Sequence, residues 1–476
     1  IAVAADALAY VLFTSGSTGK PNGVMIGRDA LAQFVVSATG RYPLSANDRV
    51  LQFAPLHFDS SVEQIFLTLC TGASLILRQE DMLESLPGFL RMCEQLRISV
   101  MDLPAAFWHE LSFCISEHEA VLPDCVRQVR IGGEAALAER VMRWRASVPP
   151  HVVLLNTYGP TEATITCVVA ELAGPNAIDF DGDTVPIGGP MAGVDIAVVD
   201  GNLRPVMYGE AGELCLMGGI LARGYLHRPQ LNSARFVQLN QLVMDQQTAQ
   251  QPSSRNAYKT GDKVVLNDDG ELRYLGRLDD EFKLSGYRID PQEIESFMLL
   301  YPGVREVAVV LQPLPGDGKR LVAFVVIDAI ADQAAPTPAA WHAFLLAYLP
   351  VVAIPGSYQV LPKLPRNINE KIDRKALRAL PLQAIDADAQ INVEGSALEQ
   401  KIMTVWREVL GVSAIHPADD FFELGGRSLQ AIQVANRLRI VLQREIVVST
   451  LYRHRSAAAL ALFLNTLEGH APPSAA

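Results

Sequence analysis

The sequence lacks the features of a nucleic-acid-binding, secreted or membrane protein. Its 476 residues include 40 Lys and Arg against 52 Asp and Glu, a formal net charge of −12, and no basic cluster could neutralise a nucleic acid backbone. No uninterrupted apolar run reaches the roughly 18 residues of a membrane span, and no charged segment leads into a signal sequence. We therefore expect a cytoplasmic protein with neither nucleic acid nor membrane among its partners.

Cysteine is sparse and unpatterned. There is no Cys-x-x-Cys pair and no His-rich segment, which argues against a zinc site and against a disulfide framework. We predict six buried thiols in a reducing compartment: Cys70, Cys93, Cys114, Cys125, Cys167 and Cys215.

What is present is ordinary globular composition, 49% apolar and 19% charged, with enough chain for about three domains at roughly 150 residues each. Residues 1–275 alternate strand-like apolar runs with helical stretches, which predicts an α/β region with helices on both faces of its sheets. Residues 280–380 contain a strand pair (305–312 and 320–328) and a helix around 341–349, typical of a small α+β domain. Residues 396–468 show helical patterns only and predict a bundle.

Several segments interrupt this pattern. Residues 240–257 are rich in Gln and Ser and predict an exposed loop, 381–395 predict a linker, and 469–476 predict a disordered tail. Ser396 with Glu399 three residues later predicts a capping box at the start of the helical region. The chain opens at Ile1 without Met and enters a strand at once, so we expect a fragment of a longer protein.

The segment 8–26, LAYVLFTSGSTGKPNGVMI, joins a predicted buried strand to a loop of glycines and hydroxyls. Glycines let a backbone approach phosphate closely, while hydroxyls, amides and an ammonium supply donors. Pro21 follows the lysine, so this is not a Walker loop; the alternative is a flexible Gly/Ser turn. The candidate phosphate-binding residues are Thr14, Ser15, Gly16, Ser17, Thr18, Gly19 and Lys20.

This loop resembles that of adenylate-forming enzymes, and six further motifs follow in the order found in adenylation domains of nonribosomal peptide synthetases. They are FDSS (58–61), NTYGPTEATI (156–165), GELCLMGGILARGYL (212–226), YKTGD (258–262), GRLDDEFKLSGYRIDPQEIE (276–295) and LPRNINEKIDR (364–374). DDFFELGGRSL (419–429) is similar to the attachment site of peptidyl carrier domains.

The resemblance implies a large α/β subdomain with mixed sheets, incomplete at its N-terminus (1–278), and a small α+β lid subdomain (279–380). After a linker (381–395) it implies a four-helix carrier domain (396–468). The implied activity is ATP-dependent formation of an aminoacyl-AMP, followed by thioester transfer to 4'-phosphopantetheine on Ser428. Two other readings remain open, an acyl- or aryl-CoA ligase and a catalytically inactive carrier scaffold.

The resemblance also assigns roles around the nucleotide. Glu162 would bind Mg²⁺, although it could be a helix-start acid, and Lys371 would bridge carboxylate and phosphate, although alone it reads as a solvated helix-entry lysine. Glu370 replaces the family's usual Gly beside Lys371. The remaining assignments are Gly133 and Glu134 beside adenine, Tyr158 stacked on adenine, Thr161 on a phosphate, Asp262 on the ribose and Arg277 on the nucleotide.

For the substrate, Asp59 would hold the α-amino group, although an Asp before two serines can also be a helix N-cap. The implied side-chain pocket comprises Ser60, Glu63, Asp102, Arg130, Gly132, Thr157, Ile165 and Thr166. If Arg130 pairs with only one of the two acids, one acid is spare, which predicts a polar substrate side chain, with a cationic one among the candidates. If both acids point at Arg130 or solvent, a small uncharged substrate is expected instead.

The remaining assignments concern the lid and the carrier. Asp279 would be the hinge, and Gly286 and Arg288 would line the pantetheine tunnel. Ser428 sits at a predicted helix start, where a plain N-cap is the alternative, and Arg427 replaces the His or Asp often found before it. Implied partners are a phosphopantetheinyl transferase, neighbouring condensation or thioesterase domains, and a small MbtH-like helper protein.

Overall fold

The computed structural model describes residues 4, 7–15, 21–180, 184–240, 254–284, 287–313, 319–328, 337–367, 371–380, 396–410, 415–422, 424, 426 and 428–468. They form two compact units, one within residues 1–288 and the other made mainly of residues from 289 onward. Each unit is described by itself. The predicted linker 381–395 and tail 469–476 lie outside the described residues, as do residues 16–20 and Gly286.

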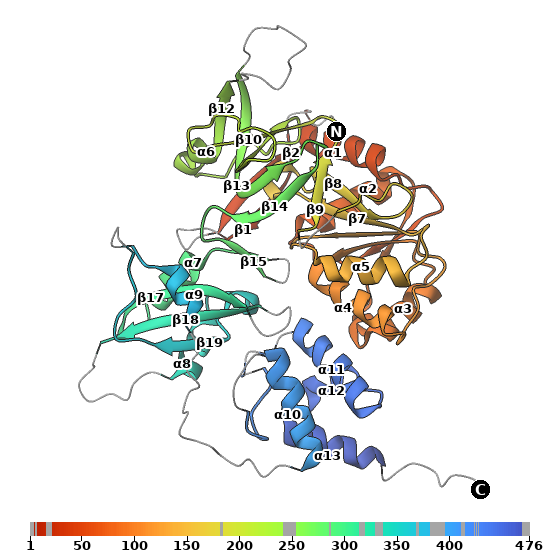
Figure 1. The fold of residues 1–476 in the computed structure, drawn as a ribbon, viewed down its shortest axis with the longest axis vertical. Coiled ribbons are helices and arrows are strands. Elements are labelled where there is room, and N and C mark those ends of the chain that lie inside the picture. The colour runs from red at the N-terminus through yellow and green to blue at the C-terminus, as the bar shows by residue number, and fades with distance from the viewer. Residues whose placement is uncertain are drawn as a thin grey trace. The chain divides into compact units, whose positions relative to one another are not determined.

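The first unit contains a twelve-stranded mixed sheet, in which the strands from β3 to β7 pair in parallel (Figure 1). Neighbouring strands here pair in parallel, which requires a crossover between them. The strands are β3 (Arg49–Gln52), β4 (Ser74–Leu77), β5 (Val100–Pro104), β6 (Gln128–Gly132) and β7 (Val153–Tyr158). The crossovers contain α2 (Asp59–Cys70), η1 (Glu80–Leu83), α3 (Leu86–Gln95), α4 (Ala105–Ser116) and α5 (Ala138–Ser147). This confirms the predicted α/β region.

The other half of the sheet is antiparallel. It contains β8 (Val168–Ala173), β9 (Pro186–Pro190), β10 (Val194–Val199), β11 (Ala211–Gly218), β12 (Phe236–Asn240), β13 (Ser254–Leu266) and β14 (Leu272–Arg277). The order across the whole sheet is β10-β11-β13-β14-β9-β8-β7-β6-β5-β3-β4, with β12 paired to β13. Asn240 ends β12 and residues 254–257 begin β13, and the two strands pair with each other. The loop predicted over 240–257 is therefore too long at both ends; residues 241–253 lie outside the described residues.

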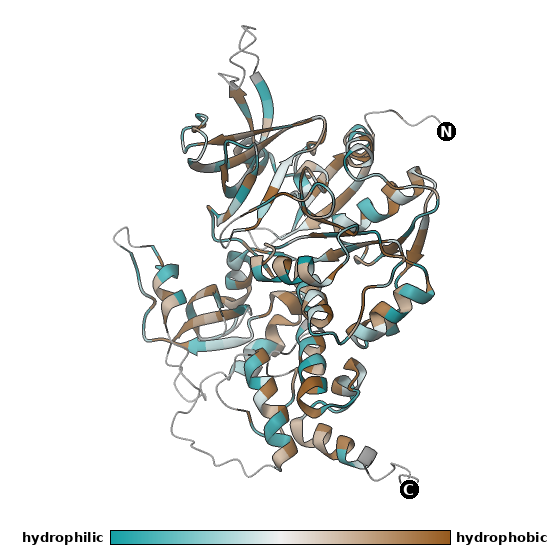
Figure 2. Cartoon of the chain, turned by 45° about the vertical axis from the view of Figure 1, so that its right-hand side comes forward, coloured by the Kyte–Doolittle hydropathy of each residue, from teal (hydrophilic) through white to brown (hydrophobic). Residues whose placement is uncertain are grey.

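Four further elements belong to this unit. β1 (Leu8–Thr14) and β2 (Asn22–Gly27) form an antiparallel pair and α1 (Arg28–Arg41) follows β2 directly. α6 (Pro229–Arg235) precedes β12. The core is formed by strands and helices together, with Phe34, Leu67, Val168 and Leu214 all completely buried. Each such side chain contributes about 1.5–3 kcal/mol through burial, and Figure 2 shows the strands of the large sheet mostly in brown.

Residues 282–380 bear out the predicted small α+β fold. A hairpin, β15 (Phe282–Leu284) and β16 (Tyr287–Ile289), precedes a three-stranded sheet in which β17 (Val304–Pro313) pairs antiparallel with β18 (Lys319–Ile327) and β18 pairs parallel with β19 (Ser357–Val360). The helices are α7 (Pro291–Met298), α8 (Pro338–Leu345), η3 (Val351–Ala353) and α9 (Arg374–Ala379). Val310, Phe324 and Leu377 belong to the core beneath this sheet.

The secondary-structure elements described between residues 397 and 468 are helices: α10 (Ala397–Leu410), α11 (Ser428–Leu442), α12 (Val448–Arg453) and α13 (Ala457–Glu468). The predicted capping box is present, because Ser396 N donates to Glu399 Oε2 (2.6 Å) and Glu399 N donates to Ser396 Oγ (3.3 Å). Trp406 of α10 packs edge-on against Phe421 with ring centroids 4.9 Å apart.

The cysteines are all free thiols, as predicted, but two are not buried. Cys70 is exposed because it ends α2 on its outer side, and Cys125 is partly exposed in a loop. Burial raises the pKa of the Cys93 and Cys215 thiols to about 12. None of the helices in the described part of the chain has the length and apolar character needed to cross a membrane.

Candidate active site

Asp59 and Thr161 meet at the centre of the first unit. Asp59 is the first residue of α2, and the N-cap position belongs to Phe58, so the N-cap interpretation of Asp59 is wrong. Its Oδ2 accepts a hydrogen bond from Thr161 Oγ1 at 2.7 Å, and burial raises its pKa. Thr161 opens the short 3-10 helix η2 (Thr161–Ala163). Asp59, predicted to bind the substrate's amino group, and Thr161, predicted to bind a phosphate, are therefore in direct contact.

Glu162, the next residue, is 1% exposed and fully engaged. Its Oε1 accepts from the Tyr225 hydroxyl (2.6 Å) and from Arg288 Nη1 (3.0 Å), which also lies 3.3 Å from Oε2. Burial alone would raise the pKa of Glu162, but Arg288 and Tyr225 bring it below its usual value. The carboxylate is thus charged and paired with a guanidinium.

Glu162 is also the expected Mg²⁺ ligand, and its surroundings fit one. Among the described residues no group of three or more His, Cys, Asp or Glu side chains could hold a metal ion. Mg²⁺ needs no such group, because it is commonly held by one or two carboxylates, substrate phosphates and water. The guanidinium of Arg288, 3.0 Å from the carboxylate, shows that this position accepts a cation.

The residues expected around adenosine also contact one another. The Tyr158 hydroxyl donates to Asp262 Oδ2, and Arg277 Nη1 donates to Asp262 Oδ1 at 3.0 Å. Tyr158 is 8% exposed, and burial together with the Asp262 charge raises its pKa well above the usual value. The Lys283 ammonium lies 5.9 Å from the centre of the Tyr158 ring. The structure therefore brings the predicted adenine and ribose residues together.

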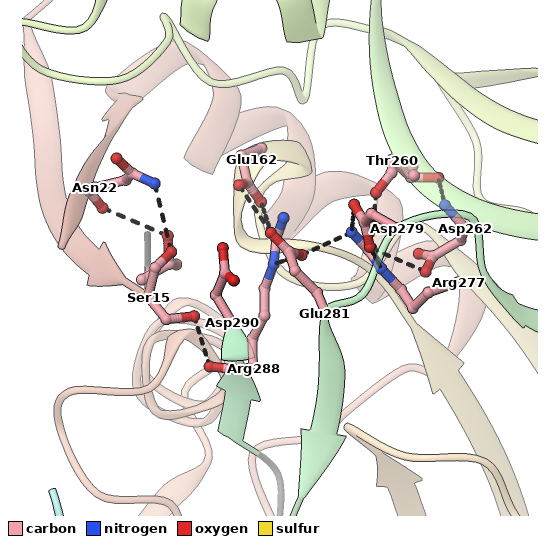
Figure 3. A network of polar contacts seen from close by, with 12 residues as sticks. Ser15, Asn22, Glu162, Thr260, Asp262, Arg277, Asp279, Glu281, Arg288 and Asp290 are labelled. Atoms are coloured by element: carbon pink, nitrogen blue, oxygen red, sulfur yellow. Dashed lines mark hydrogen bonds and ion pairs between the residues drawn. The ribbon is translucent and has the colours of Figure 1, made fainter. Parts of the chain in front are cut away.

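An ion-pair network links this end to Glu162 (Figure 3). Arg277 binds Asp279 through Nε (2.8 Å) and Nη2 (2.6 Å) and also contacts Glu281 (2.7 Å). Glu281 accepts from Arg288 Nε at 2.7 Å, and Arg288 pairs with Glu162. Asp279, the expected hinge, is further bound by Arg235 at 3.0 Å. Partial burial would raise the Asp279 pKa, but the two arginines bring it below its usual value.

The expected side-chain pocket draws its residues from α2, from the neighbouring strands β5, β6 and β7, and from the segment after η2. Asp102 of β5 and Arg130 of β6 are register partners in adjacent strands, and Glu63 faces them from α2. Gly132 ends β6, where an added Cβ would lie 2.7 Å from Thr157 Oγ1, so a larger residue would clash. The other members are placed as follows: Ser60 is half-buried on α2, Thr157 bonds the Ile131 carbonyl at 2.8 Å, and Ile165 and Thr166 are buried after η2.

Ile165 stands out because its φ is 78°. A β-branched residue in this left-handed region is strained, typically by about 1–3 kcal/mol, and such residues concentrate at functional sites. Thr164 before it also has a positive φ of 51°. Gly133 (φ 84°) and Glu134 lie in the loop after β6.

Thr14 and Ser15 are the part of the phosphate loop that the structure describes. Thr14 ends β1, and Ser15 Oγ donates to the Arg288 carbonyl at 2.7 Å. The Asn22 amide donates to the Ser15 carbonyl at 3.4 Å. Gly16, Ser17, Thr18, Gly19 and Lys20 lie outside the described residues, as does Gly286.

Lys371 and Ser428 belong to the second unit. Lys371 is exposed, and its backbone N donates to Asn367 Oδ1 at 3.1 Å. Ser428 is the first residue of α11, as predicted, and its side chain lies outside the description, as do Glu370 and Arg427. The structure therefore leaves the roles of both residues as predictions.

Sequence reasoning missed the residues that complete these contacts, namely Tyr42, Tyr225, Arg235, Glu281 and Lys283. Three of them lie within the motifs GELCLMGGILARGYL (Tyr225) and GRLDDEFKLSGYRIDPQEIE (Glu281 and Lys283). Their place in these motifs could have identified them as candidate site residues. Tyr42 and Arg235 lie outside every motif, and no local signal identifies them.

Three family models match the chain. AMP-binding enzyme matches residues 1–226, AMP-binding enzyme C-terminal domain matches 293–371, and phosphopantetheine attachment site matches 400–464. Similar proteins include the isonitrile lipopeptide synthase of Streptomyces coeruleorubidus, 49% identical over 98% of this chain and 30% of that protein. The dimodular nonribosomal peptide synthase of Bacillus subtilis (strain 168) is 33% identical over 99% of this chain and 19% of that protein. The chain thus spans less than a third of each.

Solved structures agree. Holo-PA1221, described as an NRPS protein containing adenylation and PCP domains, has a TM-score of 0.77 and 25% identity, covering 98% of this chain and 73% of that one. The Vibrio cholerae adenylation domain AlmE, solved with glycyl-adenosine-5'-phosphate, has a TM-score of 0.65 and 28% identity over 79% of this chain and 66% of that one.

Proposed function

The chain belongs to the AMP-binding enzymes, and we propose that it activates an amino acid as an aminoacyl-AMP and loads it on Ser428. It consists of an adenylation domain, the C-terminal subdomain of that domain and a phosphopantetheine carrier domain, in the arrangement found in nonribosomal peptide synthetases. The adenylation domain uses ATP, and the carrier domain provides the attachment site for phosphopantetheine. The observation that carries the proposal is the contact of Asp59 with Thr161, beside Glu162.

The chemistry explains this arrangement. A carboxylate must attack the α-phosphate of ATP, so two anions have to be brought together and their charge compensated. Asp59 would offer a half-buried carboxylate to the substrate's α-ammonium group, and the Thr161 hydroxyl would offer a donor to a phosphate oxygen. Asp262 accepts from the ribose hydroxyls in exchange for the Tyr158 hydroxyl that it now binds. Glu162 would hold Mg²⁺, which supplies charge compensation for the phosphates when bound.

The thioester step would use the carrier. The small subdomain would turn at Asp279, with Gly286 and Arg288 lining the path of the pantetheine arm. We propose domain limits of 1–278, 279–380 and 396–468, with a linker at 381–395; the change from one compact unit to the other after Arg288 supports a boundary in this part of the chain. Partners would be a phosphopantetheinyl transferase, condensation or thioesterase domains and an MbtH-like helper, in the cytoplasm.

Amino-acid-dependent ATP–pyrophosphate exchange tests the proposal. Exchange that requires an α-amino group supports it. Exchange with carboxylic acids that lack the amino group would instead support an acyl- or aryl-CoA ligase, and Asp59 argues against that outcome. No exchange with any acid would support an inactive carrier scaffold.

A further inference from the structure

Both oxygens of the buried Glu63 carboxylate accept hydrogen bonds from other side chains of the protein. Its Oε1 accepts from Arg130 Nη1 (2.8 Å) and from the Tyr42 hydroxyl (3.0 Å), and its Oε2 accepts from Thr166 Oγ1 (2.9 Å). Glu63 is 2% exposed. With both oxygens bonded and the charge balanced by Arg130, Glu63 holds the pocket together and has little left to offer a substrate.

Arg130 is equally committed to Glu63. It is 1% exposed, its Nε lies 3.3 Å from Gln128 Oε1, and its guanidinium carbon lies 4.9 Å from the centre of the Tyr42 ring. Its ion pair within the described part of the chain is with Glu63, and its Nη2 has no hydrogen-bond partner there. Arg130 therefore neutralises one acid and not two.

Asp102 is the acid left over. It lies beside Arg130 in the register of β5 and β6, yet no ion pair joins the two among the described residues. The Gln64 amide, whose proximity lowers the pKa of the Asp102 carboxyl, donates to the Asp102 backbone carbonyl at 3.2 Å. Asp102 is 9% exposed. The charged groups around it are Asp59 and Glu63 on α2 and Arg130 on β6. When Asp102 is ionised, it adds a negative charge that Arg130, already paired with Glu63, does not balance by an ion pair of its own.

Resting on the proposed function, we propose that Asp102 binds an ammonium group at the end of the substrate's side chain, so that the domain selects a cationic amino acid such as lysine or ornithine. An uncompensated buried charge is costly, and a substrate cation restores neutrality. A hydrocarbon side chain would leave the carboxylate unpaired, and an acidic side chain would be repelled by it.

The ionisation of Asp102 gives this recognition a pH dependence. Burial, reinforced by the charge of Glu63 and opposed by Arg130, raises the pKa of Asp102 to about 7. A substrate ammonium pairs only with the ionised form, so protons compete with it below pH 7. We expect KM for the cationic amino acid to fall as pH rises from 6 to 8, and this trend to disappear in Asp102→Asn.

The experiment is an exchange panel on the 476-residue chain with lysine, ornithine, glutamine, leucine and norleucine, which is lysine without its ammonium group. Wild type should prefer lysine or ornithine. Asp102→Asn should reduce kcat/KM for that substrate on the order of 10²-fold, as expected when one partner of a buried charge pair is removed. The norleucine value should stay the same or rise, because norleucine no longer leaves a buried carboxylate unpaired. Asp124→Asn, an exposed acid in a loop, should change neither.

Either of two results from this panel would overturn the inference: greatest activity with glutamine, leucine or norleucine, or an equal loss with every substrate in Asp102→Asn, which would make Asp102 structural. Thermal unfolding of each variant shows whether it is folded. Asp102→Glu keeps the negative charge and should retain the preference for a cationic substrate; loss of that preference in Asp102→Glu would also overturn the inference. Absence of exchange with every amino acid would refute the proposed function instead.

Discussion

The acidic side chains of the site are all held by donors from the chain itself. Glu162 is held by Arg288 and Tyr225, and Asp59 by Thr161. Both carboxylates are oriented by these donors, but only one is kept charged by them. Arg288 and Tyr225 bring the pKa of Glu162 below its usual value, whereas burial outweighs the Thr161 bond and raises the pKa of Asp59. A ligand that binds here therefore exchanges partners at sites that are already shaped, rather than desolvating free carboxylates, and this lowers the cost of binding.

That exchange is testable at Arg288, whose guanidinium would have to leave Glu162 before Mg²⁺ could bind. In Arg288→Ala, we expect the Mg²⁺ concentration for half-maximal exchange to fall several-fold, because the competing cation is gone. Mn²⁺ binding measured by electron paramagnetic resonance should tighten in parallel. Arg288→Lys should behave more like wild type, and Arg305→Ala, an arginine in β17, should have no effect. An unchanged metal requirement would contradict the competition.

At the scale of the element, the sequence predicted secondary structure correctly where residues close together in the chain determine it. Short apolar runs predicted the strands over 305–312 and 320–328, and a serine with a glutamate three residues on predicted the capping box. Residues 254–257 were predicted as loop, because their strand is specified by pairing with β12 and not by apolar periodicity.

The site shows the same division between local and distant information. Motifs identified Glu162, Arg288, Tyr158 and Asp262 individually, but not the pairs that they form. Glu162 and Arg288 are 126 residues apart, and Tyr158 and Asp262 are 104 apart. Such contacts depend on how strands and loops assemble, which no periodicity within either segment records. For the same reason, the sequence could not decide whether Arg130 pairs with Glu63 or with Asp102. In the structure, α2 places Glu63 beside β6, and Arg130 pairs with Glu63.

The capping box gives a prediction for α10. Ser396→Ala removes the acceptor for Glu399 N and should destabilise the helix start by about 1 kcal/mol. In hydrogen exchange on the full chain, amides of the first turns of α10 should therefore exchange about fivefold faster, since 1.4 kcal/mol corresponds to tenfold. Lys401→Ala, an exposed position within the same helix, should leave exchange unchanged. Equal protection in Ser396→Ala and wild type would show that packing alone fixes this end.

At the scale of the whole molecule, activation and loading are divided between two units. The residues around Asp59 and Glu162 lie in the first unit, and Ser428 lies in the second. Ser428→Ala should abolish covalent loading and leave pyrophosphate exchange intact, because the hydroxyl carries the arm and takes no part in forming the adenylate. After incubation with a phosphopantetheinyl transferase, intact-mass spectrometry should show the added arm on wild type only. An arm on the mutant would mean that another serine is modified.

Lys371 gives the sharpest test of how the two half-reactions share one site. By resemblance it contacts the substrate carboxylate and the α-phosphate while the adenylate forms, and the turn at Asp279 then replaces it with the segment around Gly286. A lysine used in one state only should matter for one half-reaction only. Lys371→Ala should therefore reduce exchange by roughly 10²-fold or more, comparable to the loss of an oxyanion donor.

Transfer from supplied aminoacyl-AMP to the pantetheinylated carrier should survive in the same variant, since the charge that Lys371 stabilises has already been dispersed in the adenylate. Both rates can be measured on one preparation, exchange at steady state and transfer as a single turnover. Lys375→Ala, an exposed lysine of α9 four residues further on, controls for loss of positive charge in this region and should leave both rates near wild type. If both half-reactions fall together in Lys371→Ala while thermal unfolding is unchanged, the lysine acts in both states, and the subdomain need not turn between them.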